Sequence, residues 1–541
     1  MVKKHIHRIN RWAIVGFEFL GLAAFAFFLG WLALIVRLSQ GPMDAGFLTH
    51  RIELSLAGQE SGFEFNVGST MLTWGGASQP IEQEMKQVQI SRADKTPALA
   101  VEKIGIQLSK RYLVFGQLVP RVIKIYSPAL RIVRGVDGHF QMNVSGALGT
   151  APDAAAAASQ NDFVAALLVQ LQDTGAEKLL GGLEQLAVAN AMIVYEDNAL
   201  HVNWKSKESD VTLTRVRGGL TVDAKVSMEM DQTHTALMRG SFSYIWKTHK
   251  PDGTLYFTAF NPALFAQQSE KLKGISGIDM FLRGVVTMEM DPDFNPGYGR
   301  FVLGADDGKF NASGLYAEPI ALSNLYMQGS FNGQTREAML GRFHVDLDHS
   351  KIEARAEVKQ QKEGHVITVG AVLGDMPMDN LKTYWPPTLA ADAYHWVTEH
   401  LSAGTATKAT LTLSLLAPQG DFSHLQVQDV GGDIDFNGIK VDYFPPMMPV
   451  TKVNGKASYD KKSFNLDIKG GTLGDMQVTG SKIAITDLDV QDEKTHSKID
   501  IDAALTGSIK TALTVLDGKP LQYPQKLGIK TADVGGNADI K

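Results

Sequence analysis

The sequence DIDFNG at residues 433–438 holds the acidic and amide side chains that begin a calcium-binding loop. Such a loop binds the ion through oxygen atoms at alternate positions and needs a glutamate at its twelfth position. Phe444 stands at that position here. Ile434 and Phe436 alternate with polar residues, which is typical of a strand with one buried face. The segment therefore predicts a strand with an irregularity at its glycine, and no metal site.

The sequence HWVTEH resembles the helices of zinc proteases, in which two histidines at positions i and i+4 bind the metal from one helical face. His395 and His400 are five residues apart, which separates them by about 140° around a helix. They cannot share a face in the way that zinc requires. The segment instead predicts a helix whose buried side carries Trp396, Val397 and Leu401.

The chain offers no other convincing motif for catalysis or cofactor binding. Two Gly-Lys pairs, in GADDGK (304–309) and VNGK (453–456), lack the full spacing of a phosphate-binding loop and stand in strand-like sequence. No G-x-S-x-G nucleophile motif occurs. The 14 histidines are scattered, and there is no cysteine. The sequence thus predicts a protein that is not an enzyme, has no catalytic residue, and uses no metal or cofactor.

The overall composition argues against nucleic acid as a partner. The chain has 541 residues, a formal net charge of −6 and 52 glycines. Lysine and arginine are scattered among acidic residues and form no basic stripe. The length exceeds what one compact core usually holds, so we expect about two to four domains or one elongated repeat array. Frequent glycines in short polar gaps suit a chain of many strands and turns.

The start of the chain has the pattern of a membrane anchor. A basic tail (1–11) precedes an apolar segment (12–36), which as a helix of roughly 37 Å could cross a bilayer core of ~30 Å. The positive charge predicts a cytoplasmic N-terminus, with the rest of the chain across the membrane. A cleavable signal is the alternative, but RLSQGP lacks its small-residue cleavage site. The predicted anchor residues are Trp12, Phe17, Leu20, Phe27, Trp31 and Val36.

Most of the remaining chain has the pattern of strands with one apolar face. In SFNLDIKGGTLGDMQVTGSKIAI (463–485), apolar residues alternate with polar ones on both sides of glycine-containing turns. Loosely similar patterns recur without a strict period, which is typical of an elongated β array. The predicted apolar face carries Phe464, Leu466, Ile468, Met476, Val478, Ile483 and Ile485.

Composition and periodicity divide the part after the anchor into segments. The sequence APDAAAAASQND predicts a flexible linker, and helical periodicity follows it. A short helix is expected after Asn261, with Pro262 at its first position. The predicted segments are an N-terminal β segment (37–150), the linker (151–162), a helical segment (163–185), the first part of a β array (186–385), a packing helix (386–403) and the second part of the array (404–541), which ends as if incomplete.

The apolar face of such an array can be covered in two ways. A second sheet can close over it to form a sandwich, or the sheet can curl into an open trough in which lipid chains supply the missing layer. Periodicity alone favours the sandwich, because proteins commonly bury their own apolar surface. The anchor, the length of the array and the aliphatic lining favour the trough. We expect a mainly β protein, with one N-terminal transmembrane helix followed by an elongated, curled antiparallel sheet and a few short helices.

Several segments resemble the AsmA-like family, in particular its YhdP-type branch. Segments similar to the entry of AsmA-like proteins are GPMDAGFLTHRIELSL and GQLVPRVIKIYSPALRIVRGVDGHF. Segments similar to the YhdP-type branch are NPALFAQQSEKLKGISGIDMFLRGVVTMEM, YWPPTLAADAYHWVTEHLSAGTATKATLTLSL and IDFNGIKVDYFPPMMPVTKVNGKASYDKKSFNLDIKGGTLGDMQVTG. The resemblance covers most of the chain. Proteins of this branch usually continue much further, so the chain resembles a shortened member or a fragment.

The resemblance implies a periplasmic, taco-shaped β trough that is anchored in the bacterial inner membrane, resembles the bridge-like lipid-transfer proteins, and has no fixed catalytic residues. Its implied partners are phospholipid, the inner membrane and the outer membrane. We therefore expect the seven residues of the apolar face to bind acyl chains, and the protein to help move phospholipid between the two membranes. The alternative is a non-enzymatic periplasmic scaffold or outer-membrane assembly factor made of closed sandwiches.

Overall fold

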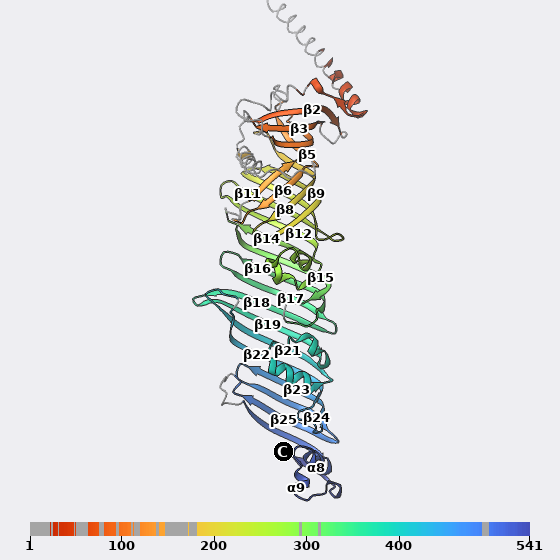
Figure 1. Cartoon of the computed structure of the whole chain (residues 1–541), viewed down its shortest axis with the longest axis vertical. Coiled ribbons are helices and arrows are strands. Elements are labelled where there is room, and N and C mark those ends of the chain that lie inside the picture. Colours follow the sequence, from red (N-terminus) through yellow and green to blue (C-terminus); the bar gives the residue numbers. More distant parts are fainter. Residues whose placement is uncertain are drawn as a thin grey trace, which may run out of the picture. The chain divides into compact units, whose positions relative to one another are not determined.

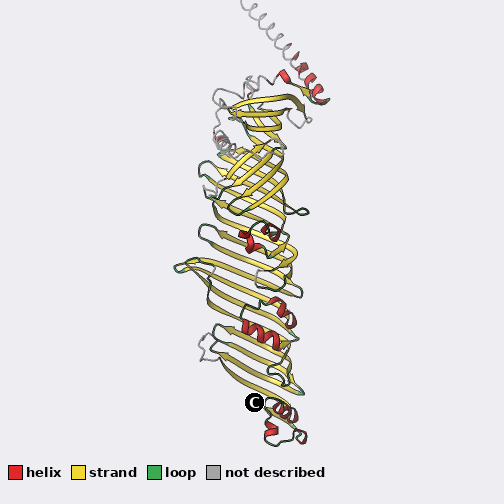
Figure 2. Ribbon diagram, in the orientation of Figure 1, coloured by secondary structure: helices red, strands yellow, loops and turns green. Residues whose placement is uncertain are grey.

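The computed structural model describes most of the chain beyond residue 180 and parts of what precedes it. The described residues are 22, 25–26, 28–30, 32–47, 49, 63–74, 81–92, 97–109, 112, 119–136, 140–145, 171–172, 181–291, 295–311, 315–422, 424–488 and 497–541. Their contacts divide the chain into an N-terminal unit (Met1–Glu229 with Ser241–Lys247) and a C-terminal unit (Met230–Gly240 with Thr248–Lys541). Both units consist mainly of strands (Figures 1 and 2), as the alternation predicts.

The predicted anchor falls mostly outside the described residues. Trp12, Phe17, Leu20, Phe27 and Trp31 are not among them. Val36 lies in a helical stretch (32–39) and is half exposed. Within the described part of the chain, no helix is both long enough and apolar enough to span a membrane.

Two further predicted segments are described in small part or not at all. The linker (151–162) lies outside the described residues. In the predicted helical segment (163–185), Leu171 and Gln172 are helical, and a strand already begins at Gln185.

The N-terminal unit contains strands β1 to β10. Antiparallel pairs join β1 to β2, β2 to β3, β3 to β4, β4 to β5, β6 to β7, β8 to β9 and β9 to β10. Their inward residues, among them Met85 and Val101, form a buried apolar cluster. The strands are β1 (Met43–Asp44), β2 (Phe63–Trp74), β3 (Ile81–Arg92), β4 (Pro97–Leu108), β5 (Pro120–Tyr126), β6 (Ala129–Arg134), β7 (Phe140–Ser145), β8 (Gln185–Asp197), β9 (Val202–Val216) and β10 (Gly219–Glu229).

Two pairings in this unit are parallel. Strands β5 and β6 both pair with β8, so that Tyr126 lies opposite Ala189 and Ala129 lies opposite Met192. The register is therefore the same on both sides of the break between β5 and β6. Ser127 has a φ of 49°, and the following proline has no N–H to donate to a ladder. These two residues interrupt the strand without shifting it along β8.

The C-terminal unit continues as strands that pair with their neighbours, and every pairing described in it is antiparallel. Strand β11 (Thr235–Ile245) has residues in both units. The other strands are β12 (Lys250–Phe260), β13 (Ile278–Met280), β14 (Leu282–Met290), β15 (Pro296–Phe310), β16 (Ile320–Asn332), β17 (Glu337–Leu347), β18 (Ser350–Gln361), β19 (Gly364–Pro377), β20 (Leu401–Ser402), β21 (Thr405–Pro418), β22 (Gln426–Val441), β23 (Val450–Asp460), β24 (Phe464–Leu473), β25 (Met476–Thr486), β26 (Lys498–Ser508) and β27 (Asn537–Ile540).

Short helices interrupt the strands of this unit. The helix predicted after Asn261 is present: the Asn261 side chain accepts a hydrogen bond from the N–H of Leu264, and Pro262 opens the helix. The helices are α5 (Pro262–Ala266), η1 (Glu270–Ile275), η2 (Met378–Asn380), α6 (Leu381–Tyr384), α7 (Ala391–His400), α8 (Ile509–Asp517), α9 (Tyr523–Lys526) and η3 (Thr531–Asp533). They follow one edge of the strands (Figure 2), because each lies in a connection on that side.

The strands from β17 to β26 thus have two different edges. The helix edge carries the connections that contain α6, α7 and α8, together with the proline-rich loop 442–449. The opposite hairpin edge carries the shorter turn between β23 and β24 and the connections between β18 and β19, β21 and β22, and β25 and β26.

Candidate functional site

One face of the C-terminal unit carries a continuous row of apolar side chains. In an antiparallel sheet, residues directly opposite each other on neighbouring strands share a face. The register places an apolar residue at each such position across nine strands, from β17 to β26. The row consists of Val345, Ile352, Leu373, Ala409, Ile434, Ala457, Leu466, Ile483 and Ile501. We call this side of the sheet the apolar face.

The opposite face of the same strands carries a row of charges of alternating sign. Each charged residue is the direct sequence neighbour of a residue in the apolar row. This charged row runs across six strands, and each cation lies opposite an anion on the next strand. Its members are Lys408, Asp435, Lys456, Asp467, Lys482 and Asp502. The ammonium of Lys456 lies 2.9 Å from a carboxylate oxygen of Asp435, and this hydrogen bond lowers the pKa of the Asp435 carboxyl. We call this side the charged face.

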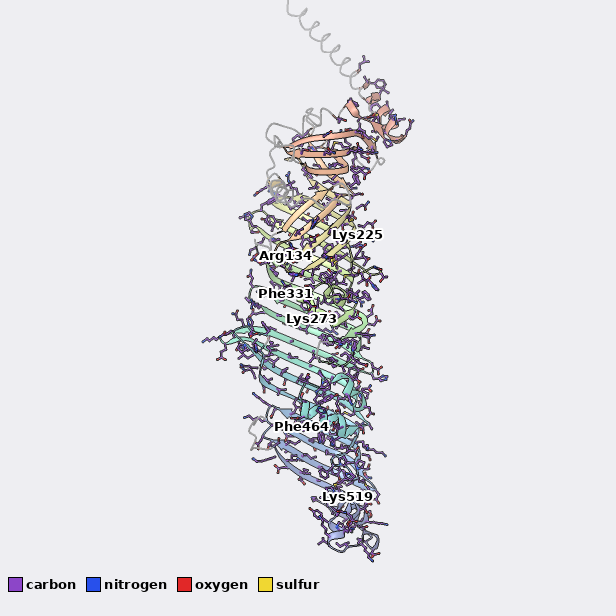
Figure 3. All side chains as sticks on the ribbon, viewed as in Figure 1. Arg134, Lys225, Lys273, Phe331, Phe464 and Lys519 are labelled. Atoms are coloured by element: carbon purple, nitrogen blue, oxygen red, sulfur yellow. The ribbon has the colours of Figure 1, made fainter. Side chains whose placement is uncertain are left out.

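The seven residues predicted for the apolar face occupy β24 and β25. Phe464 lies opposite Ile485, and Leu466 lies opposite Ile483. Ile468 follows on the same face by alternation. These five side chains are partly exposed, as is Val478. Figure 3 labels Phe464 on its strand.

Met476 differs from the other six because it is only 1% exposed. It lies opposite Leu473, which is also buried. The turn between them contains Gly474, where a Cβ atom would meet Thr511 of α8 and Met448 of the proline-rich loop. The helix edge therefore covers this end of the strands.

The same edge is closed further along the unit. Leu347, Met376, Ile439 and Val453 are buried in one cluster, and side chains of α6 and α7 pack against it. Ile468 also contacts this cluster. The apolar face is thus covered by protein beside the helix edge.

Beside the hairpin edge the apolar face is uncovered in the described part of the chain. Tyr459, Phe464, Ile485 and Ile499 lie opposite one another in a second row. The first three are partly exposed, and Ile499 is 61% exposed. Ile501 in the main row is 66% exposed. Because these aromatic and aliphatic side chains meet solvent, the face offers apolar surface on which a ligand could be buried.

A hollow of about 940 Å³ lies on the charged side of the sheet rather than on the apolar face. Side chains of the alternating charged row line it, together with Asp433 and Asp500. Leu466 and Ile483 also border it, although their side chains share the other face. A space lined by charges of alternating sign does not suit an acyl chain, so we do not assign it to one.

The motifs that suggested metal or phosphate chemistry lie in other contexts. DIDFNG is part of β22, and Gly438 has a φ of 76° at a shift of register, which confirms the predicted strand with a glycine irregularity. GADDGK lies in β15, and VNGK lies in β23. Among the described residues no group of His, Asp and Glu is placed to hold a metal ion.

The predicted packing helix is α7, but the prediction for one of its residues is wrong. Val397 and Leu401 pack against the buried cluster at the helix edge. Trp396 is 46% exposed, and its ring stacks on that of His400 at 5.3 Å. Tyr394 is buried instead. Positions 394, 397 and 401 share one side of a helix, whereas position 396 is turned away from it.

Comparison with models of protein families shows to which family the chain belongs. Residues 264–541, just over half of the sequence, match the family model described as YhdP protein. The chain belongs to the YhdP family. The match includes every strand of the apolar face described above. Searches of curated proteins and of solved structures found no match.

Some features of the site were missed by reasoning from the sequence. The contributions of Val345, Ala409 and Ala457 to the main row depend on the register across many strands, which alternation within one strand cannot supply. Ile499 and Ile501 had a visible signal, since they alternate with Asp500 and Asp502. The charged row also had a signal in the sequence, because Asp467 and Lys482 alternate with the predicted apolar residues.

Proposed function

We propose that this member of the YhdP family binds the acyl chains of phospholipids on its apolar face and helps to move phospholipid between the inner and outer membranes of a bacterium. The observation that carries the proposal is the row of nine apolar residues from Val345 to Ile501, whose members from Leu466 onward are exposed in part or in large part. Family membership supports a role of the lipid-transport type.

The physical basis is the burial of methylene groups. Each CH₂ group that leaves water contributes about 0.8 kcal/mol, so a whole acyl chain would be held firmly on an aliphatic surface. Successive strands present similar side chains to it, which would let the chain slide from one strand to the next without a large barrier. The predicted anchor at residues 12–36 would hold the protein at the inner membrane, with the C-terminal unit in the periplasm.

The alternative of closed sandwiches receives less support. A sandwich needs a second sheet facing the apolar side of the first, whereas the described strands β17 to β26 of the C-terminal unit pair one after another in a single sheet. A scaffold would gain nothing from leaving Ile499 and Ile501 in water, since uncovered aliphatic surface promotes aggregation.

Lipid content of the purified protein tests the proposal. The full chain, extracted in detergent and passed through several column steps, is expected to retain phospholipid that mass spectrometry identifies after solvent extraction. A detergent-solubilised membrane protein with one anchor helix and a soluble domain of similar size serves as the control for lipid held by the anchor alone. Lipid retention no greater than in that control would contradict the proposal.

A further inference from the structure

The two edges of the C-terminal unit differ in whether they would leave the headgroup of a bound lipid exposed to solvent. Beside the helix edge, Met376 and Met476 are each 1% exposed, and protein covers the apolar face. Beside the hairpin edge, Phe464 and Ile485 are partly exposed. A charged headgroup cannot be buried without large cost. If acyl chains lie on the apolar face, their headgroups must therefore emerge at the hairpin edge.

The turn between β23 and β24 places two lysines at that edge. Lys461 and Lys462 directly precede Ser463 and Phe464, the first residue of β24. The ammonium of Lys461 donates a hydrogen bond to the backbone oxygen of Val427 at 3.3 Å, which uses one of its three N–H groups. Both lysines are exposed, and neither forms a salt bridge with another described residue.

Two described carboxylates of this edge, Asp460 and Asp487, are already engaged. Asp460 accepts hydrogen bonds from the N–H groups of Lys462 and Ser463 and from the Ser463 hydroxyl. These bonds lower the pKa of its carboxyl, to which the charge of Lys462 adds a smaller effect. Asp487 lies 3.1 Å from the ammonium of Lys498. These two described carboxylates are thus held in local contacts, beside a turn that presents two ammonium groups.

We infer that Lys461 and Lys462 bind the phosphate of a phospholipid headgroup while its acyl chains lie on the apolar face. This inference rests on the proposed function and names the polar part of the same site. Lysine suits the task because a compact ammonium attracts phosphate oxygens as a point charge. Leu425 of the β21–β22 connection is exposed and lies two residues before Val427, whose backbone oxygen accepts the hydrogen bond from Lys461.

The test compares lipids that differ only in their headgroup. The full chain in detergent, stripped of lipid, is incubated with dioleoyl phosphatidylglycerol or with dioleoylglycerol, and the retained lipid is measured by mass spectrometry. The wild type is expected to retain more of the phosphate-bearing lipid. The double variant Lys461→Gln/Lys462→Gln is expected to retain about three- to tenfold less phosphatidylglycerol than the wild type. It should retain the same amount of dioleoylglycerol as the wild type. Lys519→Gln, at the helix edge (Figure 3), is the matched control and should behave as the wild type.

Each other outcome has a defined meaning. Unchanged retention of phosphatidylglycerol by the double variant would overturn the headgroup assignment while leaving acyl-chain binding intact. Retention of neither lipid by the wild type would contradict the proposed function itself. Inorganic phosphate at the same concentration as the lipid should not displace phosphatidylglycerol, and displacement would show a site for free phosphate and overturn the assignment. Circular dichroism of each variant checks that the sheet remains folded.

Discussion

Leu466 of β24 lies directly opposite Ile483 of β25, and the next residues on each strand, Asp467 and Lys482, lie opposite each other on the other face. A single step along either strand therefore separates an aliphatic pair from a pair of opposite charges. Because side chains alternate with a period of two, a slip of one residue would exchange the two faces. The two rows fix the same register, one by excluding charge from the apolar face and the other by pairing opposite charges.

Replacing Ile483 by aspartate should reduce lipid binding without unfolding the unit. The variant places a carboxylate in the middle of the apolar face, where it would have to lose water for an acyl chain to pass. We expect the phospholipid that co-purifies with Ile483→Asp to fall several-fold, and the free energy of unfolding to fall by no more than about 2 kcal/mol. Gln477→Asp on the same strand is exposed and is the matched control. Equal lipid content in both variants would contradict the assignment.

Two other substitutions on the face are expected to differ in their effect on stability. Ile468→Asp and Val478→Lys should both lower lipid content. Ile468 also contacts the buried cluster at the helix edge, so its substitution should cost more stability than that of Ile483. The site is therefore probed most cleanly at Ile483, which lies away from that cluster.

Reversing one charge of the charged row should destabilise the sheet in a salt-dependent manner. Lys456→Glu places a carboxylate opposite Asp435 on one side and Asp467 on the other, and like charges directly opposite each other repel. We expect a lower urea midpoint than for the wild type, and a smaller difference in high salt, which screens exposed charges. A midpoint of Lys456→Glu equal to that of the wild type at low salt would show that the row does not contribute to stability.

The pH dependence of this contact follows from the lowered pKa of Asp435. Its pKa lies below the ordinary value chiefly because of the hydrogen bond from Lys456, so the folded state favours the charged carboxylate. The contribution is present above the ordinary pKa and is lost as pH falls through the folded pKa. We expect Asp435→Asn to lower stability slightly at neutral pH and to flatten the decline below about pH 4. The effect is small because the pair is exposed. A difference from the wild type that persists unchanged in strong acid would contradict this explanation.

A glycine under an aromatic ring should not tolerate a larger residue. Gly455 of β23 lies between Phe436 and Ile468 in register, and a Cβ atom there would meet the backbone oxygen of Asp467 and the ring of Phe436. Gly455→Val is therefore expected to destabilise the unit by about 1–3 kcal/mol. Gly370→Val is the control, because nothing lies near its Cβ position. Equal unfolding midpoints in urea for the two variants would contradict the predicted clash.

The sequence was sufficient for the local elements but not for what covers them. Alternation in 463–485 predicted β24 and β25, and Asn261 with Pro262 predicted the start of α5. Burial of Met476 could not be predicted, because the residues that cover this edge come from α8 and from the loop 442–449, which are distant in sequence. Trp396 was misassigned because several sides of a short helix are apolar, and only the partner surface selects between them.

The full apolar row depends on shifts of register that no single strand reveals. The pairing of β23 with β24 shifts between Asn454 and Gly455, and that of β25 with β26 shifts between Val478 and Gly480. Lys452 has a φ of 51° and Gly480 a φ of 147°. Bulges of this kind re-aim the side chains that follow them, so the partners of each residue become known only once the strands are paired.

Site-specific photo-crosslinking in living cells tests the central claim most directly. Benzoylphenylalanine is placed at Leu466 or Ile483 on the apolar face, and at Asp467 or Lys482 on the charged face, and the full chain is irradiated and analysed by mass spectrometry. We expect phospholipid adducts at Leu466 and Ile483 and none at Asp467 and Lys482. The contrast is sharp because Asp467 directly follows Leu466 in the chain and Lys482 directly precedes Ile483. Adducts that are absent from all four positions, or equal on the two faces, would contradict the binding of acyl chains on the apolar face.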